Sequence, residues 1–182
     1  MVESRPGADA VNKRITAALI GLGACARLAP HPWNFTPLMA IGLYAGAKST
    51  KLRFGILATL LALFASDAVL GFYRGMWYVY GASCIPVLLG SLGSRRGGRA
   101  WLWGAAAVSS ISFFVLTNAA VWATGHLYPH TMGGVAACFA AAVPFYQNQI
   151  AGDIFYTAAL FGADALLRSL AQREPQMAQP CA

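Results

Sequence analysis

Residues 101–123 read WLWGAAAVSSISFFVLTNAAVWA and contain no charged side chain. About 20 such residues in a helix cross the hydrocarbon core of a bilayer, where every backbone polar group must be bonded within the chain. Similar apolar runs cover residues 15–29, 52–73, 76–93 and 150–170, and a shorter one covers 35–47. The sequence therefore predicts an all-α integral membrane protein built as a six-transmembrane-helix bundle.

Composition supports this class and a single domain. The chain has 182 residues, of which 58% are hydrophobic and 10% charged, whereas about a quarter of the residues in soluble domains are charged. We expect an N-terminal tail at residues 1–12, a transmembrane domain at 13–171 and a C-terminal tail at 172–182. The apolar run 133–143 is too short to cross a bilayer, so it predicts a separate short helix on the outer side, ended by Pro144.

The distribution of positive charge predicts the orientation. Most Lys and Arg residues lie before the first span, between the second and third, between the fourth and fifth, and after the sixth, whereas Arg27 and Arg74 stand alone in the other connections. By the positive-inside rule, both termini are cytoplasmic. The net charge of +7 then reflects topology. No basic stripe with interleaved aromatics indicates a nucleic-acid partner.

A signal peptide is the alternative interpretation of the first apolar run. Residues 22–25 read LGAC, which matches a lipoprotein cleavage box with Cys25 as the lipidated residue. Its removal would leave five spans and disturb the alternation of charge.

Polar residues inside the predicted spans point to a site. Asp67, Asn118 and Asp153 fall near the outer ends of three different spans, and Cys84 lies roughly 10 Å from the outer end of another at about 1.5 Å of rise per residue. Polar groups at this depth usually face a bundle interior or a cavity, so we expect an outward-facing pocket that captures a solute. The alternative is that they only bond helices together. In the inner half, Asp164 and Arg168 are spaced for an ion pair.

Of the four cysteines, Cys84 is the one with a candidate chemical role. The four show neither a CxxC motif nor a Cys/His spacing of a zinc site. Gly81 and Pro86 flank Cys84 and should loosen its helix, which would expose the thiol.

Several short motifs resemble those of a known family. They are residues 31–37 (HPWNFTP), 66–67 with 70–72, 80–81, 117–118 with Trp122, 128–129, and 152–153 with 155–157. Together they are similar to the substrate-binding S components of energy-coupling-factor vitamin transporters, which are small bacterial membrane proteins. The resemblance implies six helices, cytoplasmic termini, an outer ligand pocket, a location in the bacterial cytoplasmic membrane and an energising ATPase module as partner. Ala17 and Gly21 only partly match the docking face of the first helix, so a solitary carrier is the alternative.

Within that group, Cys84 resembles the cobalt-ligating cysteine of the solitary BtuM-type cobalamin-uptake proteins. The resemblance implies cobalamin as bound substrate and Cys84 as both metal ligand and catalytic residue, through displacement of the upper cobalt ligand. A thiolate is a soft donor that suits such a metal. The remaining candidate binding residues are polar or aromatic and lie in the outer half: Asn34, Asp67, Tyr80, Asn118, Asp153 and Tyr156. The candidates for a second axial ligand are His31, His126 and His130.

Three other functions stay open. The chain is alternatively a carrier for another vitamin or small solute, a membrane thiol enzyme using Cys84 with Cys138, or an assembly protein whose polar residues only join helices. The sequence contains no ATP-binding loop, so a source of energy for transport either comes from elsewhere or is absent.

Overall fold

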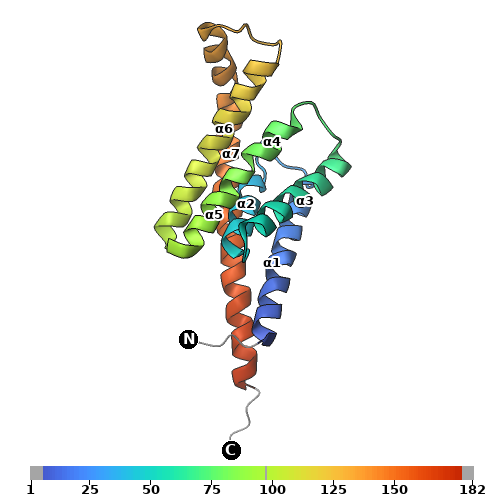
Figure 1. Cartoon of the computed structure of the whole chain (residues 1–182), viewed down its shortest axis with the longest axis vertical. Coiled ribbons are helices and arrows are strands. Elements are labelled where there is room, and N and C mark those ends of the chain that lie inside the picture. The colour runs from blue at the N-terminus through green and yellow to red at the C-terminus, as the bar shows by residue number, and fades with distance from the viewer. Residues whose placement is uncertain (1–5, 97, 178–182) are drawn as a thin grey trace, which may run out of the picture.

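The computed structural model describes residues 6–96 and 98–177, and its regular structure in these ranges is entirely helical (Figure 1). The helices are α1 (Pro6–Ala26), α2 (Leu38–Lys48), α3 (Leu52–Leu70), α4 (Met76–Ala82), α5 (Cys84–Arg96), α6 (Arg99–Thr124) and α7 (Met132–Met177). The predicted all-α fold class is confirmed.

Four helical stretches among these residues are long and apolar enough to cross a membrane. They are Leu52–Leu70, Met76–Gly93, Arg99–Thr124 and Met132–Gln172. The two remaining predicted spans, in α1 and α2, are not among these stretches, and α2 has only 11 residues. All four stretches leave large apolar side chains exposed, which is how a helix meets lipid.

The helix α2 is the centre of the bundle. Its residues Leu38 to Gly46 are all buried, and it contacts α1, α3, α5, α6 and α7. Its contact with α5 is direct backbone packing: a Cβ added at Gly46 would lie 2.0 Å from the Val87 carbonyl oxygen, and one at Gly90 would lie 2.1 Å from the Leu43 carbonyl oxygen. Small residues allow such close helix approach, which is a main source of packing in membrane bundles. Short as it is, α2 therefore determines where its neighbours lie.

The predicted fourth span is broken, as Gly81 and Pro86 suggest. Helix α4 ends at Ala82 and α5 begins at Cys84, with Ser83 between them. Pro86 has no backbone N–H, so the carbonyl of Ala82, four residues earlier, loses its usual helical donor. The Ser83 hydroxyl donates to the Val79 carbonyl oxygen at 2.7 Å. The chain thus continues in nearly the same direction, with an interruption at the depth of Cys84.

The predicted short outer helix is wrong. The run 133–143 is not a separate helix, because α7 continues from Met132 to Met177 without ending at Pro144; a proline is tolerated within a membrane helix when neighbouring helices satisfy the freed backbone groups. Helix α1 begins at Pro6 and α7 extends to Met177, so parts of both predicted tails are helical.

The start of α1 and the end of α7 lie at the same end of the molecule (Figure 1). Near that end, the predicted Asp164–Arg168 pair is confirmed, with Arg168 Nε 2.6 Å from Asp164 Oδ1. Lys48 also reaches Asp164, with Nζ 2.6 Å from Oδ2, and the Tyr44 hydroxyl donates to Oδ1 at 2.7 Å. Arg168 further donates to Thr16 Oγ1 at 3.0 Å. One buried carboxylate therefore joins α1, α2 and α7. We call Asp164 with Tyr44, Lys48 and Arg168 the Asp164 cluster.

Candidate functional site

A cavity of about 320 Å³ lies at the end of the bundle away from the Asp164 cluster. Its walls come from the segment after α1, from α2, from the α3–α4 connection, and from α4, α6 and α7. The lining residues are Arg27, Asn34, Thr36, Leu38, Met39, Tyr73, Val79, Phe113, Thr117, Gln149 and Asp153. We call this space the outer cavity. Its lining combines an apolar side with a few convergent polar groups, which is the usual character of a ligand pocket.

The segment before α2 forms part of the cavity wall because Gly152 of α7 has no side chain, which lets the two backbones approach closely. A Cβ added at Gly152 would lie 3.1 Å from both the Cα of Phe35 and the backbone nitrogen of Thr36. Asn34 adopts a left-handed backbone conformation with φ of 63°, a region in which asparagine is enriched. The Phe35 N–H donates to the Pro32 carbonyl oxygen at 3.0 Å. This tight turn places Asn34 in the lining of the outer cavity, which also includes Asp153, the residue after Gly152.

A polar network supports one side of the outer cavity. Arg27 forms an ion pair with Asp67, with Nη1 2.6 Å from Oδ1, and the same nitrogen donates to Ser66 Oγ. The Tyr80 hydroxyl donates to the other oxygen of Asp67 at 2.9 Å. Asp67 is therefore fully engaged, and α1, α3 and α4 are joined behind the cavity wall.

Tyr73 lies in the connection between α3 and α4 and closes the same side. Partial burial, with the nearby Asp67 carboxylate as a lesser cause, raises the pKa of the Tyr73 phenol. Its hydroxyl is thus neutral over the physiological pH range and can both donate and accept hydrogen bonds.

Asp153 supplies the opposite side. Its side chain is 4% exposed and interacts with Ser110 and Gln149. Gln149 Nε2 also donates to Ser110, at 3.0 Å to the carbonyl oxygen and 3.1 Å to Oγ. Among the described residues, Asp153 Oδ2 is the one buried side-chain polar atom with no hydrogen-bond partner. Such an atom needs an explanation, because leaving it unsatisfied costs about 1–3 kcal/mol or more.

The structure brings together some of the predicted binding residues and not others. Asn34 and Asp153 line the outer cavity, and Asp67 and Tyr80 lie directly behind it. Tyr156 instead packs against Phe35, with ring centroids 5.5 Å apart. Asn118 does not line the cavity, since its amide donates back to the Phe114 carbonyl oxygen at 2.8 Å.

Cys84 is half-buried and is not part of the cavity lining. Its thiol lies 3.5 Å from the carbonyl oxygen of Tyr80, one turn earlier. The buried Cys138 thiol donates to the backbone oxygen of Asn118 at 3.6 Å. Within residues 6–96 and 98–177, no three His, Cys, Asp or Glu side chains are grouped to hold a metal ion.

The three candidate histidines also lie away from the lining. His31 has Nδ1 2.9 Å from the Pro32 carbonyl oxygen and Nε2 3.3 Å from that of Arg27. His130 has Nε2 2.9 Å from the Trp122 carbonyl oxygen, and His126 is exposed. Two of the three imidazoles therefore contact backbone carbonyl oxygens that are close to them in sequence.

Residues 9–177 match a family described as a family of unknown function (DUF6580). The chain belongs to the DUF6580 family. No curated protein and no solved structure matches it. The match spans both the outer cavity and the Asp164 cluster, and the function has to be argued from these sites.

Arg27 is a cavity residue of this DUF6580 chain that a signal in the sequence indicates but that is not among the predicted site residues. Arg27 is one of two basic residues outside the predicted cytoplasmic connections, and a lone arginine at such a position indicates a partner at membrane depth. Thr117 and Gln149 carried no such signal. Thr117 lines the cavity where its neighbour Asn118 was predicted to do so.

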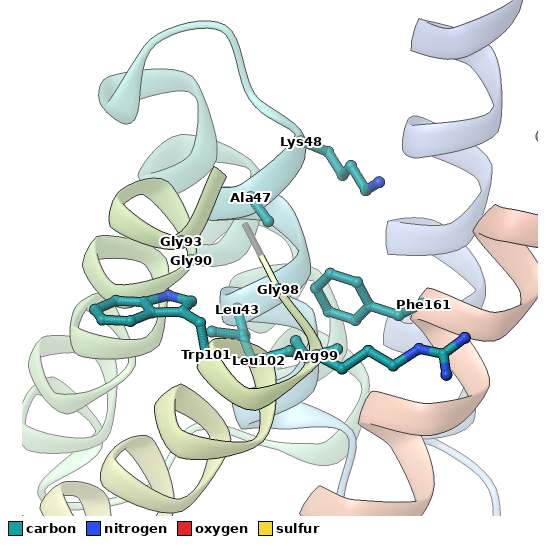
Figure 2. Close-up of a pocket in the computed structure, with 10 residues that line it drawn as sticks. All are labelled: Leu43, Ala47, Lys48, Gly90, Gly93, Gly98, Arg99, Trp101, Leu102 and Phe161. Atoms are coloured by element: carbon teal, nitrogen blue, oxygen red, sulfur yellow. The ribbon is translucent and has the colours of Figure 1, made fainter. Parts of the chain in front are cut away.

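A second cavity of about 380 Å³ lies near the Asp164 cluster. Figure 2 shows Gly90 and Gly93 on one side of it and Phe161 on the other, with Lys48 and Arg99 as its charged residues. None of the seven predicted catalytic and binding residues lines it. The outer cavity is therefore the candidate functional site.

Proposed function

We propose that this DUF6580 protein is an S-component-like uptake protein of a bacterial cytoplasmic membrane, which binds a solute in the outer cavity and carries it inward. In this proposal six helices cross the membrane and both termini are cytoplasmic. The observation that carries it is the outer cavity itself, where polar groups from several helices meet around the buried Asp153 carboxylate, one oxygen of which has no hydrogen-bond partner. Groups that only joined helices would be satisfied by each other.

The charge distribution supports the orientation. Lys48, Arg99 and Arg168 all lie near the end that carries the second cavity and the Asp164 cluster. Cytoplasmic connections are enriched in Lys and Arg, so that end faces the cytoplasm. The outer cavity then opens on the opposite side of the membrane, where a solute arrives.

Cobalamin is the ligand that the resemblance to BtuM-type proteins favours. Cys84 lies one turn after Tyr80, whose hydroxyl contacts the Asp67 network behind the cavity. A weak thiol contact to a carbonyl is easily exchanged for a bond to cobalt, which favours thiolate donors. For Cys84 to act as axial ligand, the interrupted helix at Ser83 has to swing its thiol into the cavity. Displacement of the upper cobalt ligand would follow from that bond.

A smaller solute is the second candidate, and the size of the cavity favours it. Ligand pockets run from about 300 to 1,000 Å³, and the outer cavity of about 320 Å³ is at the small end of that range. A corrin with its side chains would require the helices to move apart, whereas a small vitamin would not. Both ligands are compatible with transport that an ATPase module energises and with transport by the chain alone.

The absorbance spectrum of purified protein with cobalamin tests the choice between ligands. If Cys84 ligates cobalt, the wild-type protein shifts the spectrum and the Cys84→Ala variant does not. Cys25→Ala is the matched control, because Cys25 is an exposed cysteine on α1 and its loss should leave the shift unchanged. Identical spectra for wild type and Cys84→Ala would remove cobalamin ligation and leave the smaller solute. Uptake of labelled solutes by cells that express the chain then tests transport itself.

A further inference from the structure

The charges around the outer cavity do not balance. Its charged lining residues are Arg27 and Asp153. Arg27 is neutralised by its ion pair with Asp67. The ion pairs found among the described residues involve Asp67 and Asp164, and none involves Asp153. A carboxylate that is 4% exposed is thus left without a cation.

Arg27 cannot correct this without breaking its present contacts. Its Nη1 atom bonds Asp67 Oδ1 and Ser66 Oγ, and it lies 3.5 Å from the Leu63 carbonyl oxygen. Moving Arg27 to Asp153 would leave Asp67 buried without a counterion. No described side chain is therefore placed to pair with Asp153, and a cation bound in the cavity would fill that place.

The neighbouring groups suit a bound N–H donor. The Thr117 hydroxyl donates its proton to the Phe113 carbonyl oxygen at 2.7 Å, which leaves lone pairs of Oγ1 as acceptors. Asp153 Oδ2 is a further acceptor without a donor. Both residues line the cavity, so these two side chains offer acceptors to a ligand that supplies N–H donors. Leu38, Met39 and Val79 supply apolar contact.

We propose that the outer cavity selects solutes with a cationic nitrogen group, an ammonium or an amidinium on a small apolar body, which binds Asp153. This rests on the proposed function, because it takes the cavity to be a solute site. The ligand's charge offsets the cost of burying the carboxylate, and its N–H groups satisfy Oδ2. Hydrogen bonds between charged groups are stronger than those between neutral ones, so the preference for a cation over a neutral analogue should be about ten-fold or more.

Three probes of one shape test the proposal: benzamidine as the cation, benzamide as the neutral analogue and benzoate as the anion. Binding of each to the purified full-length chain in detergent is measured by calorimetry. We expect wild type to bind benzamidine about ten-fold or more tightly than benzamide, and benzoate least tightly. Equal binding of benzamidine and benzamide, or no binding of any probe, would overturn the proposal.

Substitution of the carboxylate gives the second measurement. Asp153→Asn should lose the preference for benzamidine, whereas Asp164→Asn should keep it, because Asp164 is also a buried aspartate but belongs to the cluster at the other end of the bundle. An unchanged preference in Asp153→Asn would overturn the proposal. Should that variant not fold, the ranking of the three probes on wild type still decides the matter.

The inference and the proposed function fail separately. Uptake of a neutral solute through a chain that shows no preference for the cationic probe would overturn only the inference. Cation-selective binding without any uptake would overturn only the carrier function.

Discussion

Arg27 and Asp67 form an ion pair, with Nη1 2.6 Å from Oδ1, that joins the end of α1 to α3 across 40 residues of sequence. The arginine side chain is 11% exposed and the aspartate 1%. Such a pair is costly to create but more costly to break, because one partner is then left buried and uncompensated. Its place beside the outer cavity makes it a structural support of that wall.

Asp67→Asn should lower the free energy of unfolding by about 3–5 kcal/mol, because Arg27 keeps its charge and loses its counterion. Chemical denaturation in detergent, followed by tryptophan fluorescence, measures the change. Arg14→Gln, at an exposed position on α1, is the control and should be close to neutral. If the Arg27→Gln and Asp67→Asn effects simply add in the double variant, the pair does not stabilise the wall.

Gly90→Ala should destabilise the bundle strongly, because the added Cβ would lie 2.1 Å from the Leu43 carbonyl oxygen on α2. Overpacking of this kind typically costs about 1–3 kcal/mol, and more where backbone has to move. Gly104→Ala is the matched control, since that helical glycine has nothing within 4 Å of an added Cβ. A thermal unfolding curve for each variant separates them, and equal midpoints would contradict direct packing of α2 on α5.

Thr117→Val should weaken binding of benzamidine several-fold, because it removes an acceptor oxygen from the cavity that Asp153 also lines while keeping the shape of the side chain. Asn118→Ala should leave that binding unchanged, because its amide bonds the Phe114 carbonyl oxygen. Calorimetry of both variants gives the comparison. The reverse pattern would show that Asn118, as first predicted from sequence, is the binding residue.

Asp164→Asn should lower the free energy of unfolding by about 3–5 kcal/mol, because Lys48 and Arg168 would both lose the counterion that they share at the other end of the bundle. The loss should be smaller in Asp164→Asn combined with Lys48→Met, because one uncompensated charge is then removed. Urea unfolding of the single and double variants measures this. A double variant less stable than the single one would mean that Lys48 stabilises the fold by another contact.

Accessibility of introduced cysteines checks the orientation. In a cysteine-free background, His126→Cys in the α6–α7 connection should react with a membrane-impermeant maleimide on intact spheroplasts. Gly98→Cys, before α6, should react only after the membrane is permeabilised. Both positions are exposed, so a difference reflects the side of the membrane. Labelling in the opposite order would invert the proposed topology.

Local properties of the chain were enough to predict the helices. An uncharged run at 101–123 becomes α6 because a helix satisfies its own backbone, and residues four apart share a face, so the Asp164–Arg168 pair followed from spacing alone. The continuation of α7 through Pro144 could not be predicted from local sequence, because neighbouring helices decide whether a proline interrupts a membrane helix.

The composition of the outer cavity was decided by tertiary structure. Successive helical residues point about 100° apart, so whether Thr117 or Asn118 faces the cavity depends on how α6 is rotated against α7. The Arg27–Asp67 pair and the unpaired oxygen of Asp153 depend on contacts between helices far apart in sequence. Hydropathy indicates that a segment can lie in a membrane, but only the packing of several helices determines which polar groups meet and which one is left without a partner.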